Sequence, residues 1–200
     1  MINKQHLKFY LVSRFLNEFA RTLPHAVLTI IFLSKGINIE EVAIIQIFFM
    51  AAIIFFELPS GIISDIYSRK FIYILSTFTL LISNYMVVIA SSYFNLCISW
   101  FIYGISTALS TGSLDSSFAN IFKKEEDIIF KKHLSNLQIT TSVSAISAGV
   151  IGGYLYNFIE INIYYISIVF LLISIFIVIT AIPSKEDTEQ INGDYRTQYS

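Results

Sequence analysis

The residues best suited to chemistry form a stripe near the N-terminus. Their spacings of i, i+4, i+7 and i+11 would place them on one face of an α-helix, and they are Arg14, Glu18, Arg21 and His25. Asn17 lies beside them, and Arg14 and Glu18 are spaced to pair along the helix. The stripe predicts either a cavity wall that binds a polar substrate or handles protons, or a salt bridge that holds helices together. His25 follows Pro24, which predicts a kink, and we expect His25 to be a polar packing residue.

Two carboxylates elsewhere could meet this stripe. Glu57 and Asp115 lie at similar depths in two other apolar segments. Arg14 enters from the same end at a comparable depth, so the sequence predicts a triad of Arg14, Glu57 and Asp115. Such a triad is either a proton or cation site or an ion-pair latch, and the latch is slightly favoured.

The composition places these charges in a membrane protein. The chain has 200 residues, of which 55% are hydrophobic and only 14% charged. Soluble domains carry about 25% charged residues, so this chain has too little polar surface to cover a water-soluble globule. The net charge of −1 gives no basic face for nucleic acid. The three histidines are far apart, so no metal site is expected.

Apolar runs long enough to cross a bilayer, about 20 residues each, predict an all-α protein with six transmembrane helices. They cover residues 7–33, 41–66, 70–91, 95–121, 136–159 and 162–182, and the polar segment 183–200 is a tail or linker. Among the 13 Lys and Arg residues, only Lys35 lies in an odd-numbered loop, while Arg14 and Arg21 lie within the first helix. The other ten are Lys4, Lys8, Arg69, Lys70, Lys123, Lys124, Lys131, Lys132, Lys185 and Arg196. This bias predicts a multi-pass protein of the cytoplasmic membrane with both termini in the cytoplasm.

Small residues form rows on the fourth and fifth predicted helices. These rows include Gly104, Gly112, Gly149, Gly152 and Gly153. Rows of small residues let helix backbones approach closely. Helix packing is therefore the favoured role, with direct substrate contact as the alternative.

The segment joining the second and third helices contains the pattern Gly-x-x-x-Asp-x-x-x-Arg-Lys, formed by Gly61, Asp65, Arg69 and Lys70. This pattern resembles the signature loop of the major facilitator superfamily, and the preceding Glu-x-Pro-Ser-Gly is similar to its drug-efflux-like branches. The resemblance implies the N-terminal six-helix half of a twelve-helix fold. It also implies that Asp65 and Arg69 contact the other half and stabilise the outward-facing state.

The resemblance predicts a gradient-driven transporter half that moves a small organic compound or drug by alternating access. Its partners would be the lipid bilayer, the substrate and a second six-helix half from the same gene, a split partner or a second copy. No cofactor is expected, and the absence of a P-loop or a Gly-x-Ser-x-Gly pattern argues against an enzyme. The alternatives are a truncated, inactive fragment and a non-transporting membrane partner or scaffold.

Overall fold

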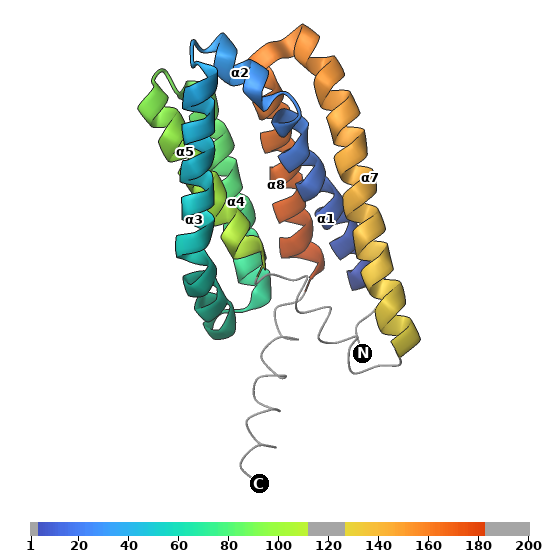
Figure 1. The fold of residues 1–200 in the computed structure, drawn as a ribbon. Coiled ribbons are helices and arrows are strands. Elements are labelled where there is room, and N and C mark those ends of the chain that lie inside the picture. The colour runs from blue at the N-terminus through green and yellow to red at the C-terminus, as the bar shows by residue number, and fades with distance from the viewer. Residues whose placement is uncertain (1–3, 112–126, 183–200) are drawn as a thin grey trace.

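The computed structural model describes residues 4–111 and 127–182, and every regular element in these two stretches is helical. The elements are α1 (Lys4–His25), α2 (Leu28–Ser34), α3 (Ile39–Ile66), α4 (Arg69–Ile89), α5 (Tyr93–Thr111), α7 (Asp127–Ile159), the 3₁₀ turn η1 (Glu160–Asn162) and α8 (Ile163–Ala181). They run alternately up and down the bundle, and α1 begins at the same end at which α8 ends (Figure 1).

Several of these helices have the length and composition of membrane spans. Three stretches of the described residues are long and apolar enough to cross a bilayer, namely Ile39–Ile63, Arg69–Ile89 and Leu134–Ala181, the last of which includes α8 and the part of α7 from Leu134 onward. The outward faces of α3 and α7 carry exposed isoleucine, valine and phenylalanine side chains. These features make the chain an integral membrane protein.

The first predicted helix is two helices in the structure. Instead of continuing through residues 7–33, it ends at His25 and restarts at Leu28 as α2. Pro24 lies in the last turn of α1 and has no N–H to donate to the carbonyl of Ala20, four residues earlier. The Ser167 hydroxyl of α8 donates to that carbonyl instead, at 2.5 Å. The break is therefore compensated by a neighbouring helix.

The other boundaries follow from local capping. A capping box starts α3, because Asn38 Oδ1 accepts from the Glu41 N–H and Glu41 Oε2 accepts from the Asn38 N–H. Gly36 turns the chain before it with a φ of +83°. The Ser68 hydroxyl caps α4 by accepting from the Phe71 N–H. The fifth predicted helix begins earlier than residue 136, at Asp127, while the predicted fourth helix extends past Thr111 into residues outside the description.

The packing order of the helices has an internal correspondence, in which each helix of one half of the order has an equivalent in the other half. The close packings place α3 beside α5, α5 beside α4, α4 beside α8, α8 beside α1, and α1 beside α7. Exchanging α1 with α5, α3 with α7 and α4 with α8 reproduces the same set of neighbours. The described helices therefore pack as two three-helix units, one of α3, α4 and α5 and the other of α1, α7 and α8, which this exchange interconverts. Inverted repeats of the kind found in many transporter folds produce such a correspondence.

Buried serines join helices within both units. Between α1 and α8, Ser13 Oγ lies 3.2 Å from the Ser174 carbonyl oxygen and Ser174 Oγ lies 3.1 Å from that of Ser13. Between α4 and α5, Ser76 Oγ donates to the Ser106 carbonyl at 3.0 Å and Ser106 Oγ donates back to that of Ser76 at 2.8 Å. Small side chains with hydroxyl groups thus allow close helix contact and add interhelical hydrogen bonds.

Each of these two seams has a second serine contact two turns away. In the α1–α8 seam it is the bond from Ser167 to Ala20, and in the α4–α5 seam it is the bond from Ser83 to the Ser99 carbonyl at 2.7 Å. Ser13 of α1 therefore corresponds to Ser99 of α5, and Ala20 corresponds to Ser106. Each of these pairs is separated by 86 residues, which is also the separation of Arg21 and Thr107.

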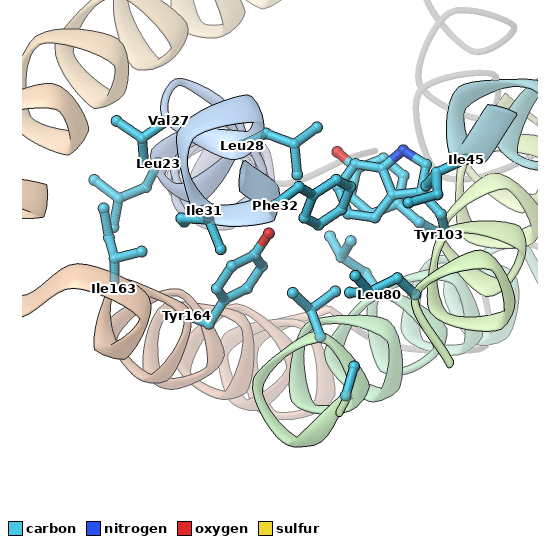
Figure 2. Close-up of a cluster of buried hydrophobic side chains, with 14 of the residues drawn as sticks. Leu23, Val27, Leu28, Ile31, Phe32, Ile45, Leu80, Tyr103, Ile163 and Tyr164 are labelled. Carbon is cyan, nitrogen blue, oxygen red and sulfur yellow. The ribbon is translucent and has the colours of Figure 1, made fainter. Parts of the chain in front are cut away.

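The main apolar core lies under α2, where both three-helix units meet. Figure 2 shows Leu28, Ile31 and Phe32 of α2 directed towards side chains of the other helices. These include Ile163 and Tyr164 of α8, Leu80 of α4, Tyr103 of α5 and Ile45 of α3. The core fixes α1 relative to α5 and so sets the distance between the residues described next.

Candidate functional site

Arg21 links α1 to α5 through side chains. Its Nη1 donates to Thr107 Oγ1 at 2.9 Å, and its Nη2 lies 3.4 Å from Ser106 Oγ. Its Cζ lies 5.3 Å from the centroid of the Tyr103 ring, which is within the range of a cation–π contact. The guanidinium is half-buried. It therefore meets polar and aromatic groups of α5.

Arg14 and Glu18 form an ion pair on the same helix. Arg14 Nη1 lies 3.8 Å from Glu18 Oε2, and the two side chains are 20% and 18% exposed. The pairing predicted from their spacing is present. It places a compensated charge pair within the two turns of α1 that precede Arg21.

His25 extends the polar face into an aromatic group of α5. Its ring stacks on Trp100 at a centroid distance of 6.1 Å and an interplanar angle of 9°, and on Tyr103 at 6.2 Å and 20°. Trp100 and Tyr103 stack on each other at 4.9 Å. The Trp100 indole Nε1 lies 3.3 Å from Gln46 Oε1 of α3. His25 is exposed while Trp100 is buried, so His25 covers the aromatic pair from outside.

Asn17 is placed differently from its charged neighbours. It is buried, and its Nδ2 donates to Thr77 Oγ1 of α4 at 2.8 Å. Its described side-chain contact is thus with α4 rather than with α5. Glu57 is exposed on α3, whereas Asp115 lies outside the described residues, so their triad with Arg14 stays a prediction.

The signature-loop residues occupy the α3–α4 connection. A Cβ on Gly61 would meet no atom within 4 Å, and the side chain of Asp65 is outside the description. Arg69 is the first residue of α4. The ammonium of Lys70 donates to the carbonyls of Ile179, at 3.0 Å, and Ile182. Lys70 therefore caps the C-terminus of α8, where carbonyl groups lack helical partners.

Lys35 does the same for α4 at the opposite end of the bundle. Its Nζ donates to the carbonyl oxygens of Ala90 at 2.7 Å and Val88 at 3.3 Å. Lys35 connects α2 to the end of α4, and the cost of burying its ammonium lowers the pKa of the side chain. The two central helices α4 and α8 are thus both capped by lysines.

Two of the five glycines predicted to pack helices lie against a neighbouring backbone. A Cβ on Gly104 of α5 would be 2.5 Å from the Phe49 carbonyl oxygen of α3, and one on Gly152 of α7 would be 2.3 Å from that of Leu23 on α1. Gly149 and Gly153 face open space, and Gly112 is outside the described residues.

The α5 side of the site was not predicted from the sequence. Trp100, Tyr103 and Thr107 are spaced i, i+3 and i+7, so they share one helix face. That spacing mirrors the charged stripe of α1 and could have identified them. No group of three or more His, Cys, Asp or Glu side chains suited to a metal ion occurs within residues 4–111 and 127–182, as far as these are described.

The chain matches a family model and a curated relative. The profile of the family described as Major Facilitator Superfamily matches residues 10–197. A protein of Buchnera aphidicola subsp. Schizaphis graminum, described as an uncharacterized transporter, is 36% identical over 138 residues. The match covers 67% of this chain and 33% of that relative, so the chain aligns with about a third of the relative's length.

Proposed function

The chain belongs to the Major Facilitator Superfamily, and on that premise we propose that it is one six-helix half of a secondary transporter. It moves a small organic compound or drug across the cytoplasmic membrane by alternating access, driven by a gradient. The Glu-x-Pro-Ser-Gly sequence before the signature loop favours export as the direction.

The observation that carries the proposal is the polar face of α1 inside an apolar bundle. Ionisable groups in membrane helices usually face protein or water and mark substrate or ion pathways, because exposure to lipid is costly. Here Arg14, Glu18 and Arg21 are all partly buried, and Arg21 reaches α5. A pathway along the α1–α5 side accounts for charges that the packing of the bundle does not require.

The proposed topology has six spans and cytoplasmic termini. Its support is the alternating course of the helices, with α1 beginning and α8 ending at one end (Figure 1). The lysine and arginine bias assigns that end to the cytoplasm.

The transport cycle needs a second half against which this unit can rock. The short match to the relative supports this, because two thirds of that protein lie outside the aligned region. Asp65 and Arg69, at the cytoplasmic end of α3 and the start of α4, are the residues that would contact the second half.

The test is dye transport in cells that express this chain together with its complementary half. Fluorescein and ethidium provide an anionic and a cationic substrate, and cells with an empty vector give the background. We expect protein-dependent movement of at least one dye and a loss of about tenfold or more in Arg14→Gln, because a lost charge-assisted contact costs about 1.5–3 kcal/mol. Lys8→Gln, an exposed change on the same helix, is the matched control. Identical dye levels with and without the protein would contradict the proposal.

A further inference from the structure

Arg21 differs from Arg14 in what balances its charge. Arg14 has Glu18 at 3.8 Å, but no carboxylate in the described part of the chain lies within ion-pair distance of Arg21. Its described partners are two hydroxyl oxygens and the face of an aromatic ring. A half-buried guanidinium within a membrane bundle is costly to leave without a counter-charge.

The hydroxyl groups around Arg21 hold the guanidinium in place. The Ser106 hydroxyl donates its proton to the Ser76 carbonyl at 2.8 Å, and the Thr107 hydroxyl donates to the Tyr103 carbonyl at 3.1 Å. Their oxygens are therefore left as acceptors, and Arg21 donates to both. A guanidinium has five N–H donors, so this arrangement fixes its orientation while leaving donors for another acceptor.

We propose that Arg21 binds the carboxylate of a small organic acid, which makes the substrate class of this site anionic. The inference rests on the proposed function and adds the charge of the ligand to it. The planar guanidinium matches a carboxylate in a two-bond geometry. The acid supplies the missing negative charge, and His25, one turn further along α1, lies exposed beside the same space.

The only tryptophan of the chain gives a direct readout of this site. Trp100 stacks on Tyr103, whose ring is also in contact with Arg21. The full-length chain in nanodiscs of phosphatidylcholine is titrated with benzoate, benzamide and benzylammonium, which share a ring and differ in charge. Thermal unfolding with each compound is the second measurement, since a ligand of the folded state raises Tm even if the fluorescence is unchanged.

We expect benzoate to change the Trp100 emission or raise Tm, with benzamide and benzylammonium at least about tenfold weaker, as for loss of a charge-assisted bond. Arg21→Gln is expected to remove the preference for benzoate. Arg21→Lys keeps the positive charge but cannot form the two parallel hydrogen bonds of a guanidinium, so it is expected to weaken the preference. Lys8→Gln is the control for removing one positive charge from α1 and keeps the preference. Equal responses to the three compounds, or an unchanged benzoate response in Arg21→Gln, overturn the proposal.

A lipid headgroup could also supply an anion. Repeating the titration in nanodiscs with phosphatidylglycerol separates these sources, because loss of the benzoate response there assigns Arg21 to lipid and overturns the substrate assignment. The proposed function fails separately. If the complete assembly transports ethidium but the chain shows no benzoate preference, transport stands and the anionic class is wrong. If benzoate binds with the expected preference but no dye moves, the anionic class stands and the transport proposal is wrong.

Discussion

The two three-helix units share a scaffold but differ in the side chains that line the space between them. The serine contacts of the α1–α8 seam have counterparts in the α4–α5 seam at equivalent positions. Along the facing sides of α1 and α5 the same correspondence brings together different chemistry. The residues Arg14, Glu18 and Arg21 of α1 correspond to Trp100, Gly104 and Thr107 of α5.

This difference separates what folds the chain from what could act on a substrate. Helix packing needs small side chains and matched hydrogen bonds in both units, and these are repeated. A binding site needs an uneven distribution of charge, and among the described residues on the facing sides of α1 and α5 the charged side chains belong to α1. Substitutions in the repeated positions should therefore affect stability, while those on the α1 face should affect binding.

The largest effect is expected at the glycine that brings α1 and α7 together. Gly152→Ala places a Cβ against the Leu23 carbonyl, so the helices must separate, at a cost of about 1–3 kcal/mol of unfolding free energy. Gly149→Ala has open space and should be neutral or stabilising by up to about 1 kcal/mol through helix propensity. Thermal unfolding in detergent measures both, and equal Tm values for the two variants would contradict the packing role of Gly152.

The next comparison tests whether the two serine seams carry equal weight. Tyr73 Oη lies 2.9 Å from Ser13 Oγ and 3.0 Å from Ser174 Oγ, so the double variant Ser13→Ala/Ser174→Ala leaves a buried hydroxyl without these partners. We expect a loss of about 1–3 kcal/mol.

The matched double variant of the other seam, Ser83→Ala/Ser99→Ala, removes one interhelical bond without stranding a tyrosine or touching Arg21, and a loss of about 1 kcal/mol is expected. Denaturant titration of both proteins gives the difference. A larger loss of unfolding free energy in the α4–α5 seam would show that the contacts of Tyr73 do not make the α1–α8 seam the more important one.

A smaller effect is expected from the lysine caps of the two central helices. Lys70→Met and Lys35→Met each remove an ammonium from the carbonyl end of a helix, for about 0.3–1 kcal/mol. The two losses should be similar in Tm measurements, because each lysine donates to two carbonyls. If only one of them lowers Tm, the caps are not equivalent.

The smallest expected effect on stability concerns the ion pair of α1. A double-mutant cycle of Arg14→Gln and Glu18→Gln should give a coupling energy of about 0.2–1 kcal/mol, as for other partly exposed pairs. The same double variant should nevertheless reduce dye transport strongly, since these groups line the proposed pathway. A stable double variant with full transport would remove the distinction between scaffold and site.

The pattern of charges on α1 could be predicted because helical spacing fixes which residues share a face. The Arg14–Glu18 pair and the all-helical fold follow from such local rules. The contacts of Arg21 with Thr107 could not, because they depend on how two helices distant in sequence are placed side by side. The contact of Asn17 could not be predicted for the same reason. Asn17 lies beside the charged stripe in the sequence, but its side chain bonds to Thr77 of α4.

The repeat itself was hidden in the sequence for a physical reason. Helix packing in a membrane requires only small or hydroxyl-bearing residues at the contacts, so Ala20 can stand where the other unit has Ser106. The glycines show a related ambiguity. Gly149 and Gly152 are equally small in the sequence, and only the approach of α1 distinguishes them.

The engagement of Lys35 by the end of α4 has a practical consequence for mapping the chain in cells. Its ammonium is already bound to two carbonyls, so amine-directed labels should react slowly with the only lysine expected on the outer surface. Thiol labelling offers a cleaner route, because the single native cysteine, Cys97, is buried. A cysteine placed at the exposed Glu40, next to the same connection, should then report on which side of the membrane it lies against a nearly silent background.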